Sequence, residues 1–166
     1  NRIPNNFKLV IVGTHADTEE YEKFLKHLSE GRSNIIMAGE RTGKAMETLY
    51  SHAYLYVQPS EQEGLSLALL EAMGHGLLPV VSDIEPHKEA VANTGVTFPV
   101  KDIEGLKKEL AYYINRSDEV AVLGRLAQER VREHYSWEAV AKKTIEVYRE
   151  VISGNMNEHY AESKSR

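Results

Sequence analysis

Apolar runs alternate with helical patterns from the first residues to about position 100, and this alternation restricts the fold more than any other feature. The runs are short, bounded by turn residues and mostly rich in β-branched or aromatic side chains, as expected of buried strands. They cover Lys8–Gly13, Asn34–Gly39, Tyr54–Pro59, Leu78–Ser82 and Val96–Pro99. Because the gaps are long enough for helical crossovers, neighbouring strands should be parallel. The pattern predicts an α/β protein with an open, doubly wound, Rossmann-like parallel sheet.

Apolar residues at helical spacing predict helices between the strands. Asp17 and Glu20 form a capping pair that begins the first helix, and Gly31 ends it. The segment Leu65–Gly74 is apolar nearly all round and is expected to be a buried helix. After about residue 100 only helical patterns remain, and their apolar faces are expected to cover the sheet. This interpretation places three aromatic residues in the core, namely Tyr112, Tyr113 and Trp137.

Composition narrows the class of protein. Hydrophobic residues make up 42% and charged residues 27%, which is typical of a soluble globular chain. There is no cysteine, which excludes disulfides, thiolate catalysis and cysteine-ligated zinc. The 20 basic residues against 25 acidic ones give a net charge of −5, which argues against a nucleic-acid-binding face. The longest apolar stretch, Leu65–Met73, is far shorter than the roughly 20 residues of a membrane span. A cytoplasmic protein is expected.

Ligands of open parallel sheets bind outside the carboxyl ends of the strands, so the strand-to-helix turns are the candidate sites. The turn after the third strand is the most informative, because Gly64 would let a ligand approach the backbone closely. The amides of Leu65, Ser66 and Leu67 would then point outward at the positive end of a helix, which suits a diphosphate. Glu63 precedes this turn, and on its own it could simply be an acid favoured by the helix dipole.

Glu71 lies eight residues after Glu63, in the helix expected to be buried. Its side chain would lean back toward the start of that helix. A carboxylate in apolar surroundings is costly unless hydrogen bonds satisfy it. The two vicinal hydroxyls of a ribose would do so, and so would neighbouring groups of the protein.

These residues carry a family resemblance. Glu63 and Glu71, with seven residues between them, resemble the E-x7-E signature of retaining glycosyltransferases of the GT-B fold, and within these the large family 4 group. That signature alone is weak, but about 140 residues share the likeness. The further matching segments are Lys8–Gly13, Leu49–Ser60, Ser82–Ala90 and Tyr135–Arg149.

The resemblance implies a role for each matching residue. Glu63 would be the catalytic residue, facing the donor sugar near its transferring carbon, and Glu71 would bind the ribose. Backbone amides would hold the diphosphate, and the turn of Glu40 and Arg41 would line the base pocket. The donor-binding set would be Gly13, Glu40, Arg41, Gly64, Leu65, Ser66, Leu67 and Glu71. The donor would be a nucleotide-diphosphate-sugar, with no cofactor and no divalent metal required. The commonest setting among such enzymes is the synthesis of surface polysaccharide or glycolipid.

The sequence departs from the family pattern at its start. Family members carry an earlier strand and helix in this half of the protein, with an Arg and a Lys that clamp the diphosphate, and an N-terminal acceptor domain before them. Residues 1–152 are therefore expected to be a donor-binding domain without its first strand and helix, and residues 153–166 a disordered tail. The absent strand usually lies at the centre of the sheet, so a gap, a new pairing or a rearrangement is expected. This chain alone is expected to lack transferase activity, and any peripheral membrane association would run through the absent half.

Other functions are less consistent with the residues. Gly39–Ala45 resembles a phosphate-binding loop but has three residues between its glycines, and Ala45 follows its lysine, so it is not a Walker loop. A flavodoxin-like or response-regulator-like domain would carry an acidic cluster after the first strand, where Gly13 is followed by threonine and histidine. The histidines show no metal-binding spacing. His87 would lie near the donor or cap a helix at the surface. A non-catalytic nucleotide- or partner-binding module remains the alternative function.

Overall fold

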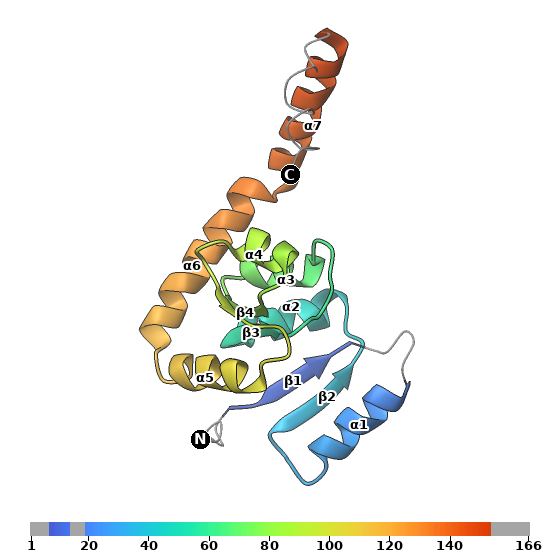
Figure 1. Cartoon of the computed structure of the whole chain (residues 1–166), viewed down its shortest axis with the longest axis vertical. Coiled ribbons are helices and arrows are strands. Elements are labelled where there is room, and N and C mark those ends of the chain that lie inside the picture. The colour runs from blue at the N-terminus through green and yellow to red at the C-terminus, as the bar shows by residue number, and fades with distance from the viewer. Residues whose placement is uncertain (1–6, 14–18, 154–166) are drawn as a thin grey trace.

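The computed structural model describes residues 7–13 and 19–153. Strands and helices alternate up to β5, and three helices follow, as the sequence predicts (Figure 1). The elements are β1 Leu9–Val12, α1 Glu19–Ser29, β2 Ile35–Gly39, α2 Gly43–His52, β3 Leu55–Gln58, α3 Leu67–Gly74, β4 Leu78–Ser82, α4 Glu85–Val91, β5 Val96–Phe98, α5 Ile103–Tyr113, α6 Ser117–His134 and α7 Trp137–Ser153. Three residues of the predicted first turn and helix cap, Thr14, His15 and Asp17, lie outside the described residues.

The strands are all parallel, but they form two sheets rather than one. β1 pairs with β2, and β4 lies between β3 and β5. Within the described chain β1 pairs only with β2, and β3 pairs only with β4. Each of β1 and β3 therefore has one edge without a strand partner. The rings of Phe7 and Tyr54, which lie just before these two strands, are nevertheless only 5.2 Å apart. The sheet is therefore interrupted between β1 and β3.

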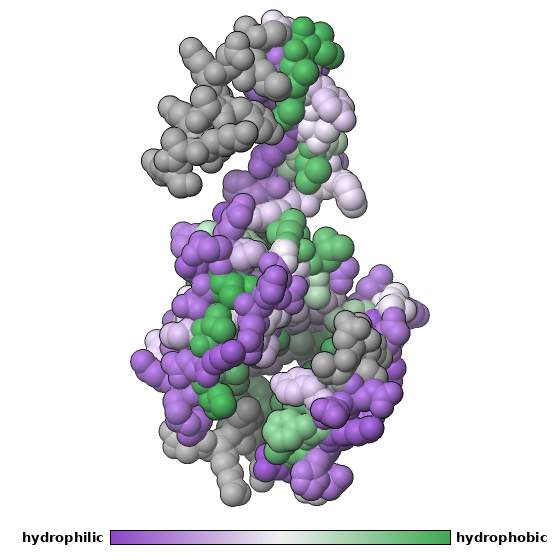
Figure 2. All heavy atoms as spheres, turned by 45° about the vertical axis from the view of Figure 1, so that its right-hand side comes forward, coloured by the Kyte–Doolittle hydropathy of each residue, from purple (hydrophilic) through white to green (hydrophobic). Residues whose placement is uncertain are grey.

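The unit of β1, α1 and β2 has little core of its own. Among the described residues before Tyr50, none is buried. Leu9 on β1 is 44% exposed and Phe24 on α1 is 53% exposed, although the strands of a parallel sheet are normally covered on both faces. Figure 2 shows hydrophobic side chains on this part of the surface and a hollow between it and the rest of the molecule.

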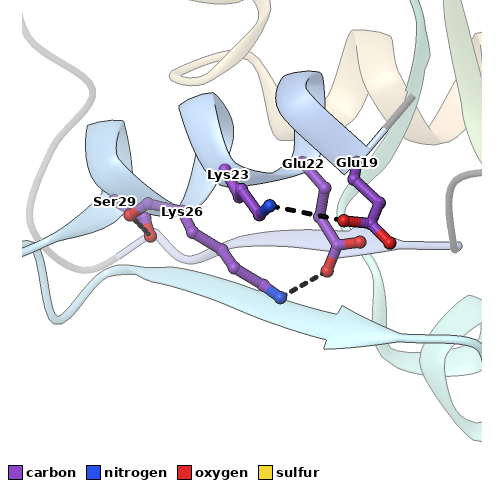
Figure 3. Close-up of polar contacts among 5 residues, drawn as sticks. All are labelled: Glu19, Glu22, Lys23, Lys26 and Ser29. Atoms are coloured by element: carbon purple, nitrogen blue, oxygen red, sulfur yellow. Dashed lines mark hydrogen bonds and ion pairs between the residues drawn. The ribbon is translucent and has the colours of Figure 1, made fainter.

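Helix α1 carries several stabilising local interactions. Its acidic first turn and basic last turn suit the helix dipole. Lys23 lies 3.3 Å from Glu19, and Lys26 forms the next ion pair along the helix with Glu22, as Figure 3 shows. Exposed pairs of this spacing stabilise a helix by only about 0.3–0.5 kcal/mol each. They do not replace the missing core.

The core lies around the sheet of β3, β4 and β5, and all five residues of β4 are buried. On one face Val81 packs with residues of α3, α4 and α6. On the other face Leu78 and Val80 pack with Phe98 and Val120. Side chains of β4 thus enter two hydrophobic clusters, because successive side chains of a strand point to opposite faces of the sheet.

Helix α6 approaches the turn after α3 more closely than a side chain would allow. A Cβ atom on Gly124 would lie 2.0 Å from the carbonyl oxygen of Gly76. Gly76 itself has φ +76°, in the left-handed region that favours glycine. The two glycines let α6 cross over the core with backbone nearly touching backbone.

The last helix departs from the prediction. Helices α5 and α6 pack against the sheet, whereas α7 contacts mainly α6 and extends away from the body of the molecule (Figure 1). Trp137 is 88% exposed, so its predicted place in the core is wrong; Tyr112 is also exposed, and only Tyr113 packs in a core cluster. An apolar helical stripe specifies that a face is to be covered, but not which part of the chain covers it. The tail was predicted for residues 153–166; Ser153 is the last residue of α7, and residues 154–166 lie outside the described residues.

Candidate functional site

The loops that follow β3, β4 and β5 are joined to one another at the carboxyl edge of the sheet. The hydroxyl of Ser82, at the end of β4, donates a hydrogen bond of 2.5 Å to the carbonyl oxygen of Ser60. The carboxylate of Asp83 accepts a hydrogen bond of 2.9 Å from the amide of Val100. At the surface, Lys101 lies 2.9 Å from Glu61. The edge that sequence reasoning selected is therefore one connected rim.

Glu63 is held on this rim by neutral donors. Its Oε1 accepts hydrogen bonds from Nε2 of Gln58 at 3.0 Å and from the hydroxyl of Ser60 at 2.9 Å. Gln58 is fixed in turn, because its Oε1 accepts from Tyr56 at 3.0 Å and from Ser66 at 3.1 Å. Glu63 lies in the loop, four residues before α3 begins, so it is not an acid of the first helical turn. Its carboxylate is exposed and oriented, with no cationic partner among the described residues.

Helix α3 begins two residues later than predicted. Ser66 is its N-cap, and the Ser66 hydroxyl accepts a hydrogen bond of 3.3 Å from the amide of Leu69. The first intrahelical bond runs from Leu70 to Ser66, so the amides of Leu67 and Ala68 precede the helical ladder. The amides predicted to point outward were those of Leu65, Ser66 and Leu67. The free amides at the start of the helix therefore lie about one residue further along the chain than predicted.

The backbone before α3 is accessible at Gly64. A Cβ atom on this residue would meet nothing within 4 Å. The side chains of Leu65 and Leu67 are exposed, at 53% and 71%. Two large apolar side chains in solvent on either side of a cap are unusual, and they flank the accessible stretch of backbone.

The predicted burial of α3 is wrong on one face. Leu69, Ala72 and Met73 are fully buried, whereas Leu67 and Glu71 are exposed. The helix is apolar nearly all round, yet the side that carries Glu71 has no covering element in the described chain. The hypothesis that Glu71 is a buried acid satisfied within the core is therefore excluded.

Two tyrosines connect Glu63 and Glu71 electrostatically. Tyr50 is 4% exposed and donates a hydrogen bond of 3.2 Å to the carbonyl oxygen of Ala68. Burial, and then the carboxylate of Glu71, raise the pKa of Tyr50 to about 12. Burial also raises the pKa of Tyr56, followed by the effects of Tyr50, Glu63 and Glu71. Both carboxylates are therefore near enough to the Tyr56 phenol to raise its pKa.

Sequence reasoning did not identify Tyr56 and Gln58 as parts of the site. A signal was present, because Tyr56 and Gln58 are two residues apart on the third strand and must share one face. Polar groups on a strand of a parallel sheet require hydrogen-bond partners, which pointed to a network at its carboxyl end.

The remaining predicted residues lie on the other sheet. The amide of Gly13 donates a hydrogen bond of 3.0 Å to Gly39, so the ends of β1 and β2 meet. Glu40 and Arg41 are exposed, and Arg41 donates to the carbonyl oxygen of Glu40 at 2.7 Å. In the part of the chain that the structure describes, no hydrogen bond or ion pair joins these residues to Glu63 or its partners. The interrupted sheet is the physical reason for the separation.

His87 is fully buried, so its suggested role as a surface cap is wrong. Its Nδ1 lies 3.2 Å from the hydroxyl of Ser82. Among residues 7–13 and 19–153, no group of three or more His, Asp or Glu side chains could hold a metal ion. No helix of that part of the chain is both long and apolar enough to cross a membrane.

Comparison with known proteins assigns a family. Residues 2–130 match the family described as glycosyl transferases, group 1. The α-maltose-1-phosphate synthase of Mycolicibacterium smegmatis is 33% identical over 91% of this chain and 42% of its own length. The sulfoquinovosyl transferase of Arabidopsis thaliana is 31% identical over 74% of this chain and 25% of its own. The chain thus spans less than half the length of these curated relatives.

Solved structures share the fold. A sucrose-phosphate synthase from Thermosynechococcus elongatus superposes with a TM-score of 0.76 at 22% identity, over 89% of this chain and 39% of that protein. The catalytic domain of starch synthase IV from Arabidopsis thaliana, bound to ADP and acarbose, gives a TM-score of 0.68 at 17% identity, over 88% of this chain and 32% of that one. The α/β architecture is therefore that of GT-B glycosyltransferases. With the family match covering most of its residues, the chain belongs to the group 1 glycosyl transferases.

Proposed function

We propose that this chain is the donor-binding part of a retaining glycosyltransferase that takes a sugar from a nucleotide-diphosphate-sugar. The observation that carries the proposal is the fixed carboxylate of Glu63, which immediately precedes an open glycine and the first amides of α3. An anionic group near a transferring sugar and donors for a departing diphosphate are the two elements that such a reaction needs.

The diphosphate binds at the start of α3. The amides of Leu67 and Ala68 and the positive end of the helix dipole stabilise its negative charge. Gly64 and Leu65 supply backbone next to it, where no Cβ on Gly64 obstructs the approach. These donors stabilise the charge that develops on the leaving group, so this part of the reaction does not depend on a divalent metal.

The two acids bind the sugars at either end of the diphosphate. Glu63 contacts the donor sugar near its transferring carbon, because Gln58 and Ser60 hold its carboxylate at the rim. Glu71 accepts hydrogen bonds from the ribose hydroxyls, for which its exposed carboxylate is available. The influence of both acids on the pKa of Tyr56 supports placing them beside one ligand.

The base pocket requires the second sheet. A further strand that pairs with the free edges of both β1 and β3 would lie between them and join the two sheets. Gly13, Glu40 and Arg41 then line the base pocket. Strands two positions apart in a sheet lie about 9.6 Å from each other, a spacing that the contacting rings of Phe7 and Tyr54 can bridge. The exposed apolar residues of β1 support such a completion.

The acceptor site lies in protein outside these residues. The curated relatives are more than twice as long as the stretch they share with this chain. Besides the maltose-1-phosphate synthase, the relatives include an O-antigen chain mannosyltransferase of Escherichia coli and a glycogen synthase of Aliivibrio fischeri, whose names refer to polysaccharides. We assign the same broad setting here, the assembly of a polysaccharide or glycolipid at the cytoplasmic side of the cell.

The exposed unit of β1, α1 and β2 favours one alternative, a module that binds a nucleotide or a partner chain without transferring sugar. Calorimetric titration of the chain with UDP, GDP and ADP, and with their sugar conjugates, tests both functions. One nucleotide should bind, and Glu71→Ala should weaken it by about 1–3 kcal/mol through lost hydrogen bonds. Equal binding by the variant would overturn the ribose assignment. No binding of any nucleotide, both by this chain and by a longer protein that supplies the further strand, would overturn the donor-binding function.

A further inference from the structure

His87 on α4 lies in the core behind the rim, with no part of its side chain exposed. Its Nδ1 is 3.2 Å from the hydroxyl of Ser82 and 3.1 Å from the carbonyl oxygen of the same residue. Ser82 is 1% exposed. Its hydroxyl reaches the carbonyl oxygen of Ser60 at 2.5 Å. A residue on one helix thus contacts, through the end of β4, the loop that carries Glu63.

The chemistry of the partners fixes where the imidazole proton lies. A carbonyl oxygen only accepts, so the contact with the Ser82 carbonyl requires a proton on Nδ1 of His87. The Ser82 hydroxyl uses its own proton toward the Ser60 carbonyl, which leaves a lone pair for the same Nδ1. His87 is therefore a donor at Nδ1. Its Nε2 is buried and has no hydrogen-bond partner in the described structure.

The contacts link four residues in series, with the covalent frame of Ser60 joining the hydrogen bond at its carbonyl to the one at its hydroxyl. The series runs from Nδ1 of His87 to Ser82, from the Ser82 hydroxyl to the Ser60 carbonyl, and from the Ser60 hydroxyl to Oε1 of Glu63 at 2.9 Å. An apolar residue at position 87 could fill the same space, but it would leave the buried Ser82 without its donor. The position therefore needs a hydrogen-bond donor at the place of Nδ1, and not merely a side chain of this volume.

We propose that His87 is a positioning residue of the donor site. Through Ser82 it fixes the backbone at Ser60 and thereby sets where Glu63 stands relative to Gly64 and the start of α3. The inference rests on the proposed function, since the ligand whose binding it controls is the sugar of a nucleotide-sugar. The nucleoside diphosphate is held mainly by the amides of Leu67 and Ala68 at the start of α3, so its binding should depend on His87 less than the binding of the sugar does.

Matched variants separate this role from a structural one. Asparagine can present an amide nitrogen near the place of Nδ1, whereas glutamine presents it near Nε2. His87→Asn should bind the nucleotide-sugar within about twofold of the wild type. His87→Gln and Ser82→Ala should bind it about tenfold more weakly, with a clearly smaller loss of affinity for the free nucleoside diphosphate. Calorimetry of each variant with the diphosphate and its sugar conjugate measures both affinities.

Backbone amide NMR on the same variants gives a reading that does not depend on a ligand. The Glu63 and Gly64 resonances should move in His87→Gln and Ser82→Ala but stay in place in His87→Asn. The proposal is overturned if the glutamine variant loses both affinities equally, if the asparagine variant behaves like the glutamine one, or if the Glu63 resonance ignores all three changes. If the wild type binds no nucleotide but the variants show the expected shifts, the proposed function is overturned and the link from His87 to Glu63 is retained.

Discussion

The amide nitrogen of Gln58 lies 3.0 Å from the carboxylate of Glu63, so the last residue of β3 orients an acid that the loop alone would leave mobile. The same Gln58 accepts hydrogen bonds from Tyr56 and Ser66. One amide side chain thus joins the strand, the acid and the N-cap of α3. The loop is ordered by the sheet beneath it, and the geometry of the acid depends on a residue outside the E-x7-E pair.

Replacing Gln58 by alanine should therefore affect both stability and donor binding. The part-buried hydroxyl of Tyr56 loses its acceptor, which should lower the free energy of unfolding by about 1–3 kcal/mol. The nucleotide-sugar should bind more weakly because Glu63 is released. Urea unfolding and calorimetry check the two effects. Gln62→Ala is the control, since Gln62 is an exposed glutamine of the same loop. Equal effects of the two variants would contradict the role given to Gln58.

Gly64→Ala should separate ligand binding from folding. A Cβ atom at this position meets nothing within 4 Å, so the free energy of unfolding should change by less than about 0.5 kcal/mol. A diphosphate that approaches the backbone there would collide with the new methyl group, and nucleotide affinity should fall at least about tenfold. Thermal unfolding and nucleotide titration of the same preparation check this. Unchanged affinity would place the diphosphate elsewhere.

The sequence was sufficient to predict the strands, because a strand covered on both faces is a continuous apolar run, as in β4. It was also sufficient to place Glu63 and Gly64 at the carboxyl edge. The prediction for α3 was wrong on one face. The helix is apolar nearly all round and was expected to be buried, but Leu67 and Glu71 are exposed, because apolar composition does not specify burial. The sequence could not place Trp137 for the same reason. It also missed Gln58, whose role arises from contacts made only after folding.

Tyr50 predicts how stability depends on alkaline pH. Its pKa is raised to about 12 in the folded chain, against about 10 for a tyrosine in an unfolded chain. The folded state therefore favours the protonated phenol, and this contribution is complete below pH 10. It is lost as the pH rises from about 10 to about 12, where the unfolded state ionises first.

Tyr50→Phe should remove that part of the pH dependence. Urea midpoints measured between pH 9 and pH 12 should fall more steeply for the wild type than for the variant, and phenolate absorbance should show one tyrosine fewer titrating late. Tyr148→Phe serves as the control, because Tyr148 on α7 is 64% exposed. If the control flattens the profile as much as Tyr50→Phe does, the assignment to Tyr50 is wrong.

Gly124→Ala tests the close crossing of α6 over the turn after α3. The added methyl group would lie 2.0 Å from the carbonyl oxygen of Gly76, and α6 would have to move away from the core. Overpacking of this kind costs about 1–3 kcal/mol or more, although alanine is a better helix former than glycine. Gly74→Ala is the matched control, because its methyl group would meet only Val131, at 4.0 Å. Urea unfolding should show a lower midpoint for Gly124→Ala and an unchanged or higher one for Gly74→Ala. The same midpoint for both variants would mean that α6 does not rest on Gly76 in solution.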